Sequence, residues 1–353
     1  MKKISKLVLV LLASLSVSFA AVAGELSVTG TAKASYVIGG ADKNAGKGYG
    51  ISNEIGLSAS GELDNGYTWK YAIALDPAAG GTVDNDDSSL TLTTPYGTVG
   101  MFITTGGLGT ETGFGIGALG VGADFKQTNS TWEVGKDISD YNNIQLHSPA
   151  GLIPFGVVVK VGYTPNLSHT NDGLDYKSEG VQASQDLGSS ATHYNISATP
   201  IDGLNVGADY FETDGGSYKK TPTNGNAWFN YTYGPVKVGY LEGYRDLALT
   251  TDASSGDASN YDLKSFGVQF AVNEALTLSY SEEELTKRTR ASIVAGAAKA
   301  VKTGVASTLT SLQAAYNIGG ATIGIARQEM DNAEYSTTGG EETATVLSLA
   351  MAF

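Results

Sequence analysis

Large apolar side chains alternate with small or polar ones along most of this 353-residue chain. The pattern is clearest in the last eleven residues. One face of a predicted β-strand there carries Thr345, Leu347, Leu349, Met351 and Phe353, because successive side chains of a strand point to opposite sides. The other face carries Ala344, Ser348, Ala350 and Ala352, with Val346 as the one large exception. An apolar strand face that ends in an aromatic residue is typical of a barrel wall in contact with lipid. The alternative is a buried edge strand of a soluble β-sandwich.

The same alternation recurs in segments that the sequence divides into sixteen predicted strands. Their connections switch strictly between short turns and eight long loops, the short ones lying at 63–66, 95–97, 149–155, 200–203, 234–235, 273–274 and 319–320. Transmembrane β-barrels have an even number of antiparallel strands, short periplasmic turns and long external loops. Pairing of the first strand with the last would leave no free edge. The pattern therefore favours an all-β, sixteen-stranded transmembrane antiparallel barrel over the sandwich.

The first 23 residues have the features of an export signal. A basic start with Lys2, Lys3 and Lys6 precedes an apolar stretch at 7–17, and Ala21-Val22-Ala23 forms an A-x-A cleavage motif before Gly24. We therefore expect a cleaved signal peptide at 1–23 and a single barrel domain at 24–353. No other apolar run is long enough to predict a transmembrane helix.

Composition agrees with a strand-rich exported protein that does not depend on disulfides. The chain contains 46 Gly, 19 Tyr, 8 Pro and no Cys. Its formal charge is −14, and loss of residues 1–23 with their three lysines would make it −17. Such an acidic chain excludes nucleic acid as an expected partner and favours a surface or lumen that attracts cations.

Two segments carry a family resemblance. Residues 141–163 (YNNIQLHSPAGLIPFGVVVKVGY) and 92–101 (LTTPYGTVGM) resemble the strands and turns on either side of the third external loop in the general diffusion porins of Gram-negative bacteria. The resemblance implies a water-filled channel, usually a homotrimer, with the third loop folded into the lumen. Arginine is scarce, with only Arg245, Arg288, Arg290 and Arg327, so the dense arginine ladder of that family is replaced by lysines or is missing.

The third long loop, residues 105–141, is the expected constriction. Its glycine-rich part is not followed by a helix with Lys-Ser/Thr, which argues against a phosphate-binding loop. The carboxylates predicted to line the constriction and favour cations are Glu111, Asp124, Glu133 and Asp137. The alternative is that these side chains solvate an external loop, and this alternative is favoured for Asp137 and Asp140.

Strand alternation also predicts charged residues on the pore wall. The side chains expected to point inward are Lys33, Glu54, Lys70, Lys160 and Arg245. A charge facing lipid at mid-depth costs roughly 2–4 kcal/mol, which makes the inward placement necessary near the membrane centre. Arg327 shares the parity of Ile323 and Ile325 and is expected to point outward. A transverse field between loop carboxylates and wall lysines is a further hypothesis.

The sequence gives no sign of catalysis or of a cofactor. His147, His169 and His193 lack a metal-ligand spacing, and we expect no metal at them. His147 and Ser148 are adjacent on a predicted strand and so point to opposite faces, which argues against a nucleophile and its base. Calcium among the aspartates of 84–87 is left open.

The resulting expectation is a non-enzymatic channel of the outer membrane. Small hydrophilic solutes and ions would pass by diffusion, with cations preferred. Outer-membrane lipid and lipopolysaccharide would surround it. The basic loop at 286–303 either contacts the lipopolysaccharide or, as the favoured alternative, is a solvated loop. The alternatives are a channel selective for a sugar, an amino acid or an anion and, more distantly, a barrel hydrolase or adhesin.

Overall fold

A computed structural model describes residues 24–39, 48–77, 83–109, 114–119, 136–167, 190–214, 221–247, 258–290, 301–302, 304–338 and 340–353. The predicted signal peptide lies outside the described residues, and so does the loop residue His169. No helix in the described ranges is long and apolar enough to cross a membrane.

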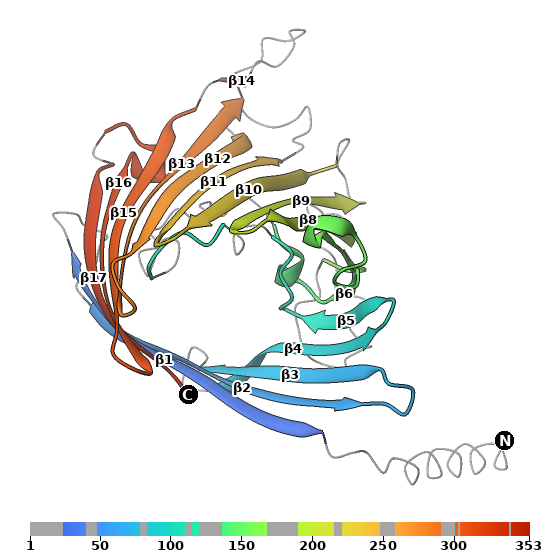
Figure 1. The fold of residues 1–353 in the computed structure, drawn as a ribbon. Coiled ribbons are helices and arrows are strands. Elements are labelled where there is room, and N and C mark those ends of the chain that lie inside the picture. The colour runs from blue at the N-terminus through green and yellow to red at the C-terminus, as the bar shows by residue number, and fades with distance from the viewer. Residues whose placement is uncertain are drawn as a thin grey trace, which may run out of the picture.

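Sixteen strands of five to fifteen residues form one closed sheet, as predicted (Figure 1). They are β1 (Glu25–Gly39), β2 (Gly48–Glu62), β3 (Thr68–Pro77), β4 (Val83–Thr94), β5 (Gly97–Ile103), β6 (Asn143–His147), β7 (Val158–Thr164), β8 (Ser190–Ile201), β9 (Leu204–Asp214), β10 (Thr223–Tyr233), β11 (Val236–Asp246), β12 (Ala258–Ala271), β13 (Leu276–Arg290), β15 (Ala306–Asn317), β16 (Ala321–Asp331) and β17 (Glu342–Ala352). The two-residue strand β14 (Val301–Lys302) pairs antiparallel with Thr289 and Arg290 at the end of β13. Within the described ranges, three short 3₁₀ helices lie outside the strands: η1 (Ile138–Asp140), η2 (Pro154–Gly156) and η3 (Ala333–Tyr335).

Every neighbouring pair of strands is antiparallel, and β1 closes the barrel by pairing with both β2 and β17. The β1–β17 register runs from Thr31 opposite Ala352 to Gly39 opposite Ala344. It continues to Phe353, whose backbone N–H donates to the Gly30 carbonyl (2.9 Å) and whose carbonyl accepts from the Gly30 N–H (2.7 Å). The Phe353 ring lies over Gly30, where a Cβ atom would collide with it. The expected pairing of the first and last strands is confirmed.

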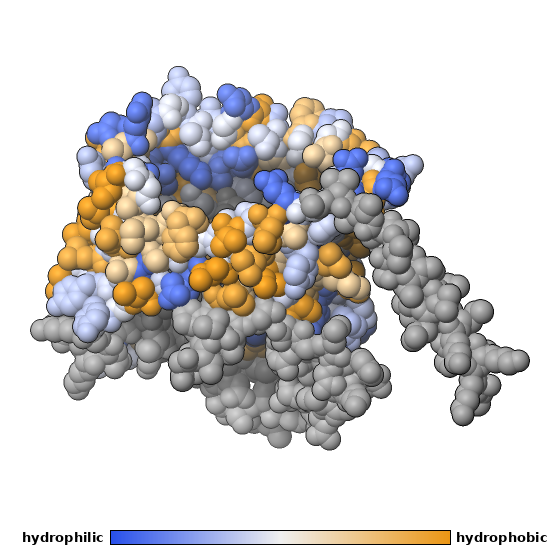
Figure 2. Space-filling view, turned by 90° about the horizontal axis from the view of Figure 1, so that it is seen from below, coloured by the Kyte–Doolittle hydropathy of each residue, from blue (hydrophilic) through white to orange (hydrophobic). Residues whose placement is uncertain are grey.

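The outer face of the barrel is apolar. On β17, Leu347, Leu349 and Met351 are exposed, whereas Ala344 and Val346 point inward and are buried. Figure 2 shows hydrophobic side chains gathered in a band over the outer face, with hydrophilic ones along one rim. Such a band is the surface that a transmembrane barrel presents to lipid.

Val346 was the exception in the predicted pattern, and the structure explains it. It belongs to an inward-facing apolar cluster with Leu309, Ala326 and Met330, against which the loop residue Leu119 packs. A large apolar side chain therefore lies inside the barrel where a loop covers it.

Several strands are longer than predicted at the end with the long loops. Strand β4 begins at Val83 and β10 at Thr223, and β13 continues to Arg290. The prediction of a basic loop at 286–303 is therefore wrong for residues 286–290, which belong to β13. The strand continues through these basic residues because they have partners. Arg288 forms an ion pair with Asp262 of β12, and the Lys287 ammonium lies 5.4 Å from the centroid of the Tyr335 ring.

Candidate functional site in the barrel lumen

Polar side chains line the inner face of the barrel. On β6, Asn143 and Gln145 point inward and are buried, while the intervening Ile144 and Leu146 are exposed on the outside. The same alternation places further buried polar side chains inside, including those of Asp209, Asn226, Ser265, Ser279, Ser281, Gln313 and Gln328. The wall therefore has an apolar outer surface and a polar lumen.

The third long loop connects β5 to β6, and residues 104–109, 114–119 and 136–142 of this loop are described. The first piece lies against β6, β7 and β8. The Asn143 side chain donates to the Thr105 carbonyl (3.2 Å), and the Asn195 side chain donates to the Leu108 carbonyl (2.7 Å). Leu108 is buried over Gly162 of β7. These contacts hold the first piece in the lumen, against the inner face of the barrel wall.

The second piece, residues 114–119, is called the inner segment below. Phe114 and Ile116 are buried over Gly239 of β11, and Ile116 also covers Gly267 of β12. The Ala118 N–H donates to the Ser279 hydroxyl of β13 (2.7 Å), and the Leu119 N–H donates to the Gln313 side chain of β15 (2.8 Å). The segment thus follows the inner wall across several strands, as the loop drawn inside the barrel in Figure 1 shows.

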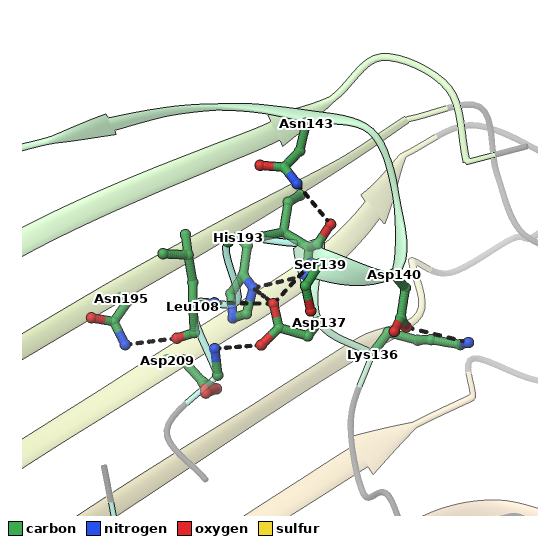
Figure 3. A network of polar contacts seen from close by, with 12 residues as sticks. Leu108, Lys136, Asp137, Ser139, Asp140, Asn143, His193, Asn195 and Asp209 are labelled. Atoms are coloured by element: carbon green, nitrogen blue, oxygen red, sulfur yellow. Dashed lines mark hydrogen bonds and ion pairs between the residues drawn. The ribbon is translucent and has the colours of Figure 1, made fainter. Parts of the chain in front are cut away.

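The third piece is held by Asp137 (Figure 3). Its carboxylate accepts hydrogen bonds from the backbone N–H groups of Leu108 (3.0 Å), Gly109 and Ser139 (3.1 Å), so it joins the two ends of the loop. The Nδ1 atom of His193 on β8 lies 3.5 Å from Asp137 Oδ1 and accepts from the Ile138 N–H (3.3 Å). The His193 ring is almost fully buried and meets Phe211 edge-on.

Two groups in this piece have shifted pKa values. Burial alone would raise the pKa of Asp137, but the neighbouring His193 ring and the N–H groups of Leu108 and Ser139 lower it below the usual 3.8. Burial and the negative charge of Asp140 raise the pKa of Tyr141 to about 12. Asp137 therefore stays ionised and Tyr141 stays neutral over the whole physiological range.

A cavity of about 440 Å³ opens beside this loop base. The His193 ring lines this cavity together with four carboxylates and one ammonium group. These charged groups belong to Asp87, Asp137, Asp140, Asp209 and Lys136. Lys136 Nζ lies 3.5 Å from Asp140, and the Asp209 carboxylate accepts from the side chain of Asn226 (3.0 and 3.1 Å). Carboxylates therefore outnumber the ammonium group in the lining of this cavity.

Neither a family model nor a curated protein sequence matches this chain. Solved structures do match over almost its whole length. An anion-selective porin from Comamonas acidovorans has a TM-score of 0.65 at 12% identity, covering 94% of this chain and all of that one. The outer membrane protein OmpT of Vibrio cholerae without its loop L8 has a TM-score of 0.63 at 14% identity, with the same coverage. A mutant porin of Rh. blastica has a TM-score of 0.59 at 15% identity, covering 93% of this chain and all of that one.

The chain has the porin fold. At these identities the likeness extends to the fold alone, and the function has to be inferred from the lumen.

In this porin fold, the predicted wall residues point into the barrel. Lys33 is paired with Ser52, and Lys70 with Ser60 and Thr91, while the flanking Tyr36 and Tyr71 are exposed on the outside. Glu54 is opposite Thr31, and Lys160 is opposite His147. Arg245 lines an inner pocket with Tyr141 and Lys136. Arg327 points outward as predicted, where it pairs with Glu329 (3.2 Å).

Of the predicted constriction carboxylates, Glu111, Asp124 and Glu133 lie outside the described residues. Asp137 lies at the loop base, with its carboxylate directed at backbone N–H groups. Sequence reasoning missed Asp87 and Asp209. Asp209 had a usable signal, because the neighbouring Tyr210 points outward and the next residue of a strand points inward. Asp87 was considered only for calcium, and it lies on β4.

The remaining candidates do not form a reactive site. The Ser148 hydroxyl accepts from the Val159 N–H (3.0 Å), and His147 Nε2 lies 2.7 Å from the Gln145 side chain, so the two neighbours have separate partners. Within the described ranges, no three His, Asp or Glu side chains converge where they could hold a metal ion. The side chains of 84–86, considered for calcium, lie outside the described residues.

Proposed function

We propose that this protein is an outer-membrane porin that lets small hydrophilic solutes and ions diffuse passively through a water-filled lumen. The observation that carries the proposal is a closed sixteen-stranded barrel with an apolar exterior, a polar interior and a long loop that follows the inner wall. Barrels of this strand number enclose an aqueous channel. No cofactor or covalent chemistry is needed for diffusion.

Cation preference is part of the proposal. The carboxylates of the luminal cavity and the strongly acidic chain support it. Glu111, Asp124 and Glu133 would add to the negative side of the constriction. The inward Lys33, Lys70 and Lys160 face the lumen from other strands, so a transverse field between loop carboxylates and wall lysines would orient dipolar solutes.

We also propose that the barrel assembles as a homotrimer in the outer membrane, exported by a signal peptide at 1–23. Small outward residues on β1 and β2, namely Ala32, Ala34 and Ala59, support close packing of another subunit against this part of the wall. The Vibrio cholerae OmpT with the same fold is described in a trimer form. Outward Arg288 and Lys264, near the long loops, would meet lipopolysaccharide.

A channel selective for one sugar, amino acid or anion is the second candidate. The luminal cavity favours it, because it gathers charged groups and the buried Asn226 at one place. Flux that saturates for one solute in liposome swelling would distinguish this candidate from free diffusion.

The decisive experiment is a planar-bilayer recording of the purified, folded protein under a KCl gradient. The proposal expects large conductance steps, often in threes, and a reversal potential on the cation-selective side. An anion-selective reversal potential would retain the channel and remove the cation preference. Absence of conductance from a heat-modifiable, folded barrel would overturn the proposal and leave a hydrolase or adhesin barrel.

A further inference from the structure

We propose that five wall residues form a docking track that fixes the inner segment and sets the cross-section of the channel: Gly239, Gly267, Ser279, Gln313 and Gly324. This inference rests on the proposed function and deepens it, because it assigns the size limit of the channel to positioning residues on the wall. None of the five needs to touch a solute.

The glycines of the track allow the inner segment to lie close to the wall. Gly239 and Gly267 are paired across β11 and β12 and both face inward. A Cβ atom at Gly239 would lie 2.8 Å from Ile116 and 3.0 Å from Phe114, and one at Gly267 would lie 2.9 Å from the Cβ of Ile116. On β16, a Cβ atom at Gly324 would lie 2.6 Å from Leu119. Contacts below 3.0 Å force something to move, so any side chain here would lift the segment from the wall.

The polar members of the track fix its position along the wall. Ser279 and Gln313 accept the N–H groups of consecutive residues, Ala118 and Leu119, as described above. Gln313 is itself oriented, because its amide donates to the Ser311 hydroxyl (3.0 Å), which also accepts from Gln328 (3.3 Å). A backbone N–H that is buried in a protein needs such a partner. At the other end of the segment, the Lys237 ammonium donates to the Gly115 carbonyl (2.8 Å).

Strands β11 to β16 thus hold the six residues of the inner segment through both apolar and polar contacts. Phe114 and Ile116 turn their side chains to the wall and are fully buried with Leu241, Leu263 and Leu285. Because interiors are close-packed, the segment has one position in which these side chains fit. The distance between segment and wall then fixes how much of the lumen remains open.

The test compares Gly267→Val with Ile116→Ala and with the control Gly50→Val. Gly50 also faces the lumen, on β2, but a Cβ there would have nothing within 4 Å. We expect Gly267→Val to push the segment into the channel and to lower single-channel conductance by roughly a third, since conduction depends on pore dimensions. Ile116→Ala should increase open-channel noise and raise the size limit for sugars in liposome swelling. Gly50→Val should conduct like the wild type.

Hydrogen exchange gives a second readout that does not depend on conduction. The amides of Ala118 and Leu119 should be protected in the folded wild-type barrel and should lose protection in Ser279→Ala/Gln313→Ala. Fast exchange of both amides in the wild type would overturn the docking track. Equal conductance of Gly267→Val and Gly50→Val, with both barrels folded, would overturn its control of channel size. A wild-type barrel that does not conduct would instead overturn the proposed function, while exchange still decides whether the segment is anchored.

Discussion

Asp137 shows how one carboxylate can hold the two ends of a long loop together. It was expected either at the constriction or as a solvated loop residue, and its carboxylate in fact joins residues 108–109 to 137–139. His193 of β8 holds the same loop base to the wall through the Ile138 N–H. The His193 ring and the backbone N–H groups together lower the pKa of this carboxylate although burial raises it.

The pKa shift of Asp137 leads to a pH prediction. Because the folded pKa lies below the usual 3.8, the contribution of Asp137 to stability is present above that value and is lost as pH falls through the folded pKa. Asp137→Asn keeps one acceptor oxygen but replaces the other with an NH2 donor that faces a backbone N–H, and it should cost about 1–3 kcal/mol at pH 7. Denaturant unfolding in detergent at pH 7 and pH 3 should show the difference from wild type shrinking at the lower pH.

The control for this prediction is Asp64→Asn in the exposed turn at 63–66, which should leave stability unchanged at both pH values. A loss of stability in Asp137→Asn that stays equal at pH 7 and pH 3 would contradict the assignment, since it would not arise from the charge.

At the scale of elements, the closing pair of strands depends on a small residue. The Phe353 ring covers Gly30, so Gly30→Leu places a side chain where the ring lies. Overpacking of this kind costs typically about 1–3 kcal/mol. We expect a lower unfolding midpoint and weaker heat resistance of the folded band on SDS gels. Val28→Leu, two residues earlier on the same outward face, should behave like the wild type, and equal stability of the two variants would show that the ring moves aside freely.

Strand alternation was sufficient to predict the barrel, its closure and the direction of most side chains. It predicted Lys33 and Lys70 inside and Arg327 outside because a strand in this wall has only two faces. The prediction failed where a contact from elsewhere in the chain changes which side chains a strand face carries or where the strand ends. Val346 is apolar and inward because Leu119 covers its cluster. Lys287 and Arg288 continue β13 because Tyr335 and Asp262 provide partners that a local pattern does not reveal.

The candidate site was less predictable than the fold for the same reason. The sequence indicated an acidic loop, but it gave no means to pair Asp137 with His193, which lies 56 residues further along the chain. The inner segment was read only as glycine-rich, although its apolar residues Phe114 and Ile116 are what bind it to the wall. Glycines on the wall strands gave no signal by themselves, because their role depends on the loop that covers them.

At the scale of the whole molecule, opposite charges in the lumen should move selectivity in opposite directions. Asp87→Asn/Asp140→Asn removes negative charge from the luminal cavity and should shift the reversal potential in a KCl gradient toward zero. Lys33→Gln/Lys70→Gln removes positive charge from the inner wall at β1 and β3 and should shift the reversal potential further to the cation side. The same direction of shift in both double variants would contradict an electrostatic origin of selectivity.

The salt dependence of selectivity tests whether that field acts across water or through direct contact with the permeating ion. Charges that line a water-filled lumen act over the Debye length, which falls from about 10 Å at 0.1 M to about 3 Å at 1 M salt. If the cavity carboxylates attract cations from a distance, the cation-to-anion permeability ratio should fall steadily between these concentrations at a fixed KCl gradient. Conductance should meanwhile rise almost in proportion to salt, as in an open aqueous path. A permeability ratio that stays constant up to 1 M, with conductance that saturates, would instead indicate ions bound directly at a narrow site, and would favour the selective channel over general diffusion.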